Sequence, residues 1–167
     1  RICAAIADLA PLWEPGTQTG YHSYTMGWIL GEILRRIDGR PIARFVQDEI
    51  CAPLGLHSLF LGISDREEPR VAFLEDAPLP EGGSMRTPLS MRAAPANLPA
   101  SAVLFNRPEI RRASFPAAGG IMSARAIARL YASLATGVDG VRLLPPERVA
   151  LIAREQTRER DRVIGLK

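Results

Sequence analysis

The sequence predicts an α+β fold that is mainly helical and contains little β-structure. Apolar residues recur at three- and four-residue steps, the spacing of one helix face, over 26–37, 41–50 and 123–137. Only 59–63 has the composition of a short strand. With 167 residues, 47% of them apolar and 23% charged, the chain has the size and composition of one ordinary domain. We therefore expect residues 1–167 to fold as a single unit.

The helix over 26–37 is the longest predicted element. A short helix over 1–8 and a loop precede it. Ser23 or Thr25 can cap its start, and Gly39 suits the position just past its end. We expect one stripe of this helix to be buried, formed by Met26, Ile29, Leu30, Ile33, Leu34 and Ile37.

Three further helices are expected after Gly39. Pro41 fits the first turn of a helix that runs to about residue 50, because proline lacks the N–H that is unpaired there in any helix. Ser123 can cap the next helix, which ends at Gly137. The last helix starts at a proline and spans 145–154.

The segment 64–115 interrupts this regularity. Eight of the 14 prolines fall between Ser64 and Pro116, and the apolar residues there show no sustained period. We expect a long irregular segment, either ordered as a loop or partly mobile.

The charge pattern argues against nucleic acid as a partner. The net charge is only +3, and every basic residue except Lys167 is arginine. The arginine-rich stretch 158–162 alternates in sign, as a solvated surface does, rather than forming a basic stripe. We therefore predict no nucleic-acid partner.

The cysteines and histidines do not have metal-site spacing. Cys3 and Cys51 lie far apart, and neither His22 nor His57 has a partner at ligand intervals. We expect two free cysteines, no metal and no other cofactor. No apolar run reaches the roughly 20 residues of a membrane span, and the sequence does not assign a compartment.

Tyr21 and Ser23 are candidate functional residues. They stand two residues apart in the loop before the long helix, so both side chains can project from that turn. A tyrosine acts as a base at neutral pH only where a cation or a proton relay favours the phenolate. Without such a neighbour, stacking or hydrogen bonding is the commoner role for a tyrosine in this position.

A wider pattern surrounds these two residues. It comprises Trp13-Glu-Pro-Gly-Thr17, Gly20-Tyr-His-Ser23, Gly27-Trp28, Gly31-Glu32, Arg35-Arg36, Gly39-Arg40, Pro53-Leu54-Gly55 and Pro116-Ala-Ala-Gly-Gly-Ile-Met-Ser123. In this order the motifs resemble the serine β-lactamase and penicillin-binding-protein family, most closely the family VIII carboxylesterases related to class C β-lactamases. The resemblance implies the helical portion of the β-lactamase/transpeptidase-like fold, with most of the antiparallel sheet missing.

The same resemblance implies roles for site residues. Tyr21 corresponds to the catalytic proton-transfer tyrosine, and Ser23 to the hydroxyl that orients the substrate or the relay. Gly119 and Gly120 would let the backbone approach a bound substrate, although a tight turn before the Ser123 cap is the plain alternative. The implied substrate is a small-molecule ester, amide or β-lactam. An ester is favoured because Ser23 replaces the asparagine usual in class C β-lactamases.

The nucleophile motif of this family does not occur in the sequence. That motif is Ser-x-x-Lys, and no serine is followed by lysine at the third position. We therefore expect a fragment of a serine hydrolase that is inactive alone, and a noncatalytic interaction module with the same fold is the alternative. Helices separated from their sheet would expose apolar stripes, so we also expect self-association.

Overall fold

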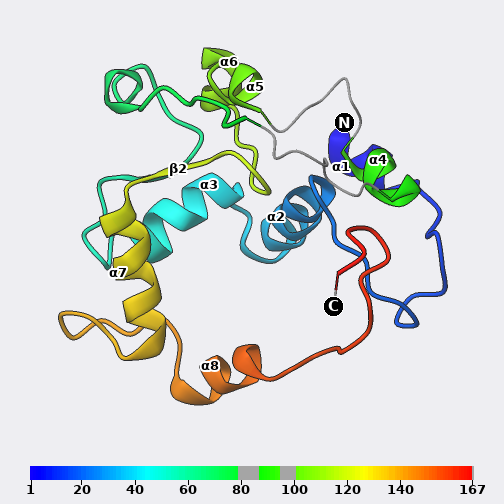
Figure 1. Cartoon of the computed structure of the whole chain (residues 1–167). Helices are drawn as coiled ribbons and strands as arrows, with labels where there is room; N and C mark the ends of the chain where they lie inside the picture. The colour runs from blue at the N-terminus through cyan, green and yellow to red at the C-terminus, as the bar shows by residue number, and fades with distance from the viewer. Residues whose placement is uncertain (79–86, 95–100, 167) are drawn as a thin grey trace.

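The fold consists of helices joined to one small antiparallel sheet. The computed structural model describes residues 1–78, 87–94 and 101–166. Figure 1 shows the chain as an open ring in which the C-terminal segment returns beside the N-terminal loop. The mainly helical α+β class is thus confirmed. In chain order the elements are α1 (Ile2–Ala7), α2 (Thr25–Asp38), α3 (Ile42–Phe45), η1 (Val46–Cys51), β1 (Leu59–Leu61), η2 (Glu68–Arg70), α4 (Pro88–Ala93), α5 (Ala102–Phe105), α6 (Pro108–Arg112), β2 (Gly120–Met122), α7 (Ala124–Ala135) and α8 (Pro146–Ala153).

Of the two caps predicted for α2, only the C-terminal one is confirmed. Gly39 follows the helix with φ +88°, and its N–H donates to the carbonyl of Arg35, as a left-handed glycine cap requires. At the start, the N-cap residue is Tyr24, and no side chain caps the helix. The predicted cap by Ser23 or Thr25 was wrong, because Thr25 is already the first helical residue. Its Oγ1 lies 2.8 Å from Nδ1 of His22 instead.

The predicted burial of the α2 stripe was also wrong. Ile29 and Leu34 are half-buried, but four of the six side chains are 48% to 81% exposed. The covered side of α2 is the one that carries the buried Gly27. The helical period therefore identified an apolar face without showing whether anything covers it. We call the exposed residues the α2 apolar stripe: Met26, Leu30, Ile33 and Ile37.

The second predicted helix changes its hydrogen bonding midway. Pro41 is the N-cap of α3 rather than a residue of its first turn. α3 then continues into the π-helical turn η1, where the N–H of Ala52 donates to the carbonyl of Gln47 at 2.9 Å. Cys51 closes η1 and is 1% exposed. The last residue of this helical segment, Cys51, is therefore part of the core.

The hydrophobic core lies between η1, β1 and α7. Leu54 is 1% exposed and, with Cys51, is among the most deeply buried side chains described. Such burial of aliphatic surface is the main favourable contribution to stability. The buried cluster consists of Cys51, Leu54, Leu56, Leu59 and Ala126, against which Val46, Ile50, Leu130, Val138, Val141 and Leu143 pack.

The sheet pairs one predicted strand with one that was not predicted. β1 falls within the expected 59–63 segment, and β2 pairs with it in antiparallel register, with Phe60 opposite Ile121. The pairing leads directly into α7, whose N-cap Ser123 accepts a hydrogen bond from the N–H of Ala126, as predicted. β1 and β2 therefore bring the two ends of segment 62–119 together.

The described part of the irregular segment contains four short helices: η2, α4, α5 and α6. Thr87 caps α4 by accepting a hydrogen bond from the N–H of Ser90. Residues 79–86 and 95–100 of the segment lie outside the described ranges. None of the helices within those ranges combines the length and hydropathy needed to cross a membrane.

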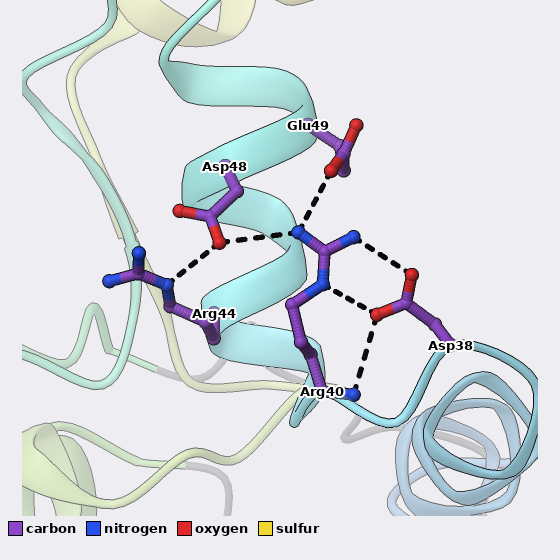
Figure 2. Close-up of polar contacts among 5 residues, drawn as sticks. All are labelled: Asp38, Arg40, Arg44, Asp48 and Glu49. Atoms are coloured by element: carbon purple, nitrogen blue, oxygen red, sulfur yellow. Dashed lines mark hydrogen bonds and ion pairs between the residues drawn. The ribbon is translucent and has the colours of Figure 1, made fainter.

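An ion-pair cluster connects the turn between α2 and α3 to η1 (Figure 2). Arg40 Nε donates to Asp38 Oδ1 at 2.6 Å, and Arg40 Nη1 lies 3.2 Å from Asp48 and 2.8 Å from Glu49. Arg44 Nε adds a second bond to Asp48 at 2.7 Å. The Arg40 guanidinium lowers the pKa of Asp38, and Asp38, followed by Glu49, raises the pKa of Arg40.

Candidate active site

Tyr21 and Ser23 project from the loop that enters α2. The Tyr21 side chain is 53% exposed, and Ser23 is half-buried. Within the described residues, neither hydroxyl makes a hydrogen bond. His22, which lies between them, makes a side-chain hydrogen bond with Thr25, the first residue of α2. This bond holds the end of the loop against the start of the helix. The loop thus presents an exposed tyrosine side chain just before the start of α2.

An aromatic cluster connects this loop to the second motif. The Phe115 ring stacks on Trp28 with centroids 4.8 Å apart and lies 5.3 Å from Tyr24. Phe105 also stacks with Phe115, with ring centroids 6.4 Å apart. Offset stacking of this kind stabilises a contact beyond the area that it buries. Phe115 therefore anchors the residues before Gly119 to the first turns of α2.

The backbones meet even more closely at Gly27. An ideal Cβ on Gly27 would lie 2.4 Å from the N of Ala117 and 2.8 Å from the carbonyl carbon of Pro116. No larger residue fits there without moving one of the two segments. The structure therefore brings the segments of both sequence motifs into direct contact, one starting at Gly20 and the other ending at Ser123.

Gly119 and Gly120 line a cavity of about 280 Å³. Ile121 and Met122 of β2 continue this wall, and Phe105 and Ile110 are among the residues that complete the cavity. An ideal Cβ at Gly119 would lie 2.8 Å from Cβ of Phe115, so the cavity wall at Gly119 depends on a glycine. Both glycines therefore lie in the wall of this cavity. Their role in binding substrate stays a prediction.

Tyr21 and Ser23 do not line this cavity. The plain alternative for the glycines is correct in part, because the segment does turn after Phe115, where the N–H of Gly119 donates to the Phe115 carbonyl at 2.7 Å. Gly120, however, belongs to β2 rather than to the turn. The candidate site is therefore two adjoining parts, a tyrosine loop and a cavity wall, joined through Phe115.

One member of a partly buried ion pair, Arg111, lines the cavity. Arg111 contacts Glu68 through Nη2, and their side chains are 15% and 22% exposed. Arg111 Nε and Glu68 Oε2 are buried without a hydrogen-bond partner among the described residues. Arg111 lines the cavity, so it adds a cationic group to a mainly apolar wall.

The two cysteine thiols hydrogen-bond to backbone carbonyls, that of Cys3 to the carbonyl of Trp28 at 3.8 Å. Cys3 and Cys51 are both free, as expected. The Sγ of Cys51 donates to the Leu59 carbonyl at 3.6 Å, and burial raises the pKa of its thiol. In the described part of the chain, no three histidine, cysteine, aspartate or glutamate side chains gather into a group that could hold a metal ion.

Three residues of the site were not predicted to have the roles that the structure shows. Phe115 and Arg111 were not singled out, and Gly27 was named only as part of the motif pattern, since each acts through partners far along the chain. Gly27 carried one usable signal, because glycine inside a helix is unfavourable unless a close approach requires it. Phe115 carried none beyond its place beside the motif that begins at Pro116.

Comparison with known proteins places the chain in a family. The family model named Beta-lactamase matches residues 1–166. Esterase/beta-lactamase LipL of Mycobacterium tuberculosis (strain ATCC 25618 / H37Rv) is 28% identical over 174 residues, which cover 93% of this chain and 38% of that protein.

Solved structures agree with this result. A penicillin-binding-protein homologue from Caulobacter crescentus is 37% identical with a TM-score of 0.81, and the match covers 98% of this chain and 44% of that chain. A family VIII carboxylesterase is 30% identical with a TM-score of 0.85, and the match covers 99% of this chain and 44% of that chain. EstA from Arthrobacter nitroguajacolicus Rue61a is 33% identical with a TM-score of 0.80, and the match covers 98% of this chain and 45% of that chain.

These matches confirm the resemblance that the motifs indicated, including its closeness to family VIII carboxylesterases. The chain spans less than half the length of each of these relatives. That coverage agrees with a helical portion of the β-lactamase fold that holds little of its sheet. The chain belongs to the Beta-lactamase family.

Proposed function

We propose that these residues are the tyrosine-bearing part of a longer serine hydrolase that acts through an acyl-enzyme. The observation that carries this proposal is the contact between Gly27 and the backbone of 116–117, which holds the Tyr21 segment against the Gly119 segment. The names of the relatives, esterase, β-lactamase and carboxylesterase, support the same class of chemistry.

In this proposal Tyr21 moves the proton. The serine oxygen attacks the carbonyl carbon of the substrate, and the serine proton passes by way of Tyr21 to the leaving group as its bond to the carbonyl breaks. Water then hydrolyses the acyl-serine, with Tyr21 relaying the proton in the opposite direction. Ser23 orients the substrate or this relay, and the wall at Gly119 and Gly120 borders the bound acyl group.

The nucleophile and its lysine would lie outside these 167 residues. The sequence holds no Ser-x-x-Lys, and its relatives are more than twice as long as the matched region. A tyrosine without its target serine and activating cation has nothing to deprotonate. The chain by itself is therefore expected to lack hydrolase activity.

The test compares two proteins with p-nitrophenyl butyrate and with nitrocefin as substrates. One is the 167-residue chain, and the other is the product of the reading frame extended on both sides. We expect turnover only in the longer protein, faster with the ester. Replacing Tyr21→Phe there should lower kcat by about 100-fold or more, the usual contribution of a positioned proton-transfer group.

Tyr131→Phe is the matched control, because Tyr131 is also exposed, at 65%, but lies on α7 outside the candidate site. Unchanged kcat in the Tyr21→Phe protein would contradict the relay role. Tyr21-dependent turnover by the 167-residue chain would contradict the proposal that the nucleophile and its lysine lie outside these residues.

A noncatalytic interaction module is the second candidate, favoured by the exposed α2 apolar stripe. Such a module would bind another protein through this stripe. An upstream Ser-x-x-Lys in the reading frame supports the enzyme, whereas start and stop codons directly flanking the 167 residues support the module.

A further inference from the structure

The loop that carries Tyr21 is tied to the C-terminal segment. The N–H of Arg162 donates to the Thr19 carbonyl at 2.9 Å. The Thr19 hydroxyl donates to Thr157 Oγ1 at 3.3 Å, across 138 positions of sequence. Figure 1 shows the same arrangement, with the C-terminal segment beside the N-terminal loop. The position of the loop therefore depends on residues that follow α8.

The backbone directly before Tyr21 has no free space around it. An ideal Cβ on Gly20 would lie 2.7 Å from Cη2 of Trp13 and 3.3 Å from Cγ2 of Val163. Both distances are shorter than ordinary van der Waals contact. Trp13 and Val163 thus pack directly against Gly20, one from the start of the chain and one from its end.

Val163 is itself held in a closed turn. Asp161 Oδ1 accepts hydrogen bonds from the N–H groups of Val163 at 2.8 Å and Ile164 at 2.9 Å. The N–H of Asp161 donates to the Leu166 carbonyl at 2.8 Å. Thr87, the N-cap of α4, donates its hydroxyl to the Val163 carbonyl at 2.5 Å. Val163 is 9% exposed, so its side chain has little freedom to move away from Gly20.

The Tyr21 side chain has no such support. It is 53% exposed and makes no hydrogen bond to the described residues. The point from which it projects is set by its backbone, which is held in place at the neighbouring Gly20. We infer that Val163 is a positioning residue for Tyr21, acting through its contact with Gly20. The functional importance of this contact depends on the proposed relay role of Tyr21.

The test uses the 167-residue chain with 13C-labelled tyrosine rings, so it needs no turnover. Tyr21→Phe identifies the Tyr21 resonances. In Val163→Ala we expect these resonances to shift and broaden, and the amide of Arg162, which donates to the Thr19 carbonyl, to exchange about tenfold faster, because a local contact is lost. The Tyr131 resonances and the α7 amides should not change.

Two further variants separate positioning from general stability. Ile164→Ala is the matched control, because Ile164 belongs to the same turn but is 42% exposed. It should leave Tyr21 unchanged. Val163→Thr keeps the shape of the side chain and should restore the native Tyr21 resonances. If Val163→Ala also loses α7 protection, Gly20→Ala replaces it, since it crowds the same contact from the loop side and should shift the Tyr21 resonances.

Unchanged Tyr21 resonances in both Val163→Ala and Gly20→Ala would overturn the inference, as would an equal shift in Ile164→Ala. The proposed function fails separately. If Tyr21→Phe leaves kcat unchanged in the longer enzyme while Val163→Ala still shifts Tyr21, the turn positions a tyrosine that is not catalytic.

Discussion

Gly27 lies where a helix and a second backbone come closer than a side chain allows. Adding one methyl group in Gly27→Ala would place Cβ 2.4 Å from the N of Ala117. One of the two segments must then move, and overpacking of this kind typically costs about 1–3 kcal/mol. We expect the free energy of unfolding to fall by that amount, measured by urea denaturation followed by circular dichroism.

Gly31→Ala is the matched control one turn along the same helix. The nearest atom to an ideal Cβ at Gly31 is Cγ2 of Ile42 at 3.5 Å, an ordinary contact. Alanine also has the better helix propensity, so this variant should gain about 0.5–1 kcal/mol. Equal effects of the two substitutions would show that the close approach at Gly27 does not determine stability.

Single residues were predictable where their chemistry is local. Ser123 and Gly39 were identified because a cap is decided within a few positions of the chain. Tyr21 was identified by the motif around it. Phe115 and Val163 were not, because their partners lie about 90 and 140 positions away and no local pattern records such contacts.

At the level of elements, the sequence predicted long periodic helices better than short strands. α7 and the second half of α2 have strong helical periods and clear end signals. β2 has only three residues and begins with a glycine, so it carries no alternating pattern. Its strand conformation comes from pairing with β1, which is a tertiary contact.

The charged side of α2 should make stability depend on acidity. Hydrogen bonds from Arg35, then Arg36, lower the pKa of Glu32 from 4.5 to about 2. A carboxylate whose pKa is lower in the folded state stabilises the fold above its unfolded pKa and loses that effect as pH falls toward the folded value. We therefore expect the Tm to fall between pH 5 and pH 2, and Glu32→Gln to reduce this fall.

The measurement is thermal unfolding of both proteins across that pH range. Their Tm values should differ most at pH 6 and converge near pH 2, where Glu32 becomes protonated. Glu14→Gln is the control, since no arginine pairs with Glu14 among the described residues. A constant Tm difference between Glu32→Gln and the parent chain at all pH values would contradict this prediction.

For the whole molecule, the α2 apolar stripe predicts self-association. Its four residues follow the 4-3-4 spacing that lines one side of a helix, and each is at least 48% exposed. Burying such a surface against a second copy removes apolar area from water. We expect the purified chain to form dimers or larger species at micromolar concentration, and Leu30→Glu to shift it toward the monomer.

Light scattering coupled to size exclusion gives the mass directly. Leu12→Glu introduces the same charge at another exposed leucine, outside the stripe, and should leave the mass unchanged. A chain that is monomeric throughout, with a sharp unfolding transition at high temperature, would contradict the prediction. The helical period showed this apolar surface but not its exposure, which was expected only from the resemblance, because helices separated from their sheet leave such stripes uncovered.

The pairing of β1 with β2 has a consequence for chain length. It closes residues 62–119 into a single loop whose two ends are fixed by the sheet. The entropy of closing a flexible loop grows only slowly with its length, by about 0.6 kcal/mol for each doubling. Insertions or deletions within the loop should therefore leave the core beside Cys51 and Leu54 almost unaffected. Because the same loop supplies Phe105 and Ile110 to the cavity, we expect changes in loop length to alter the cavity while the core stays constant.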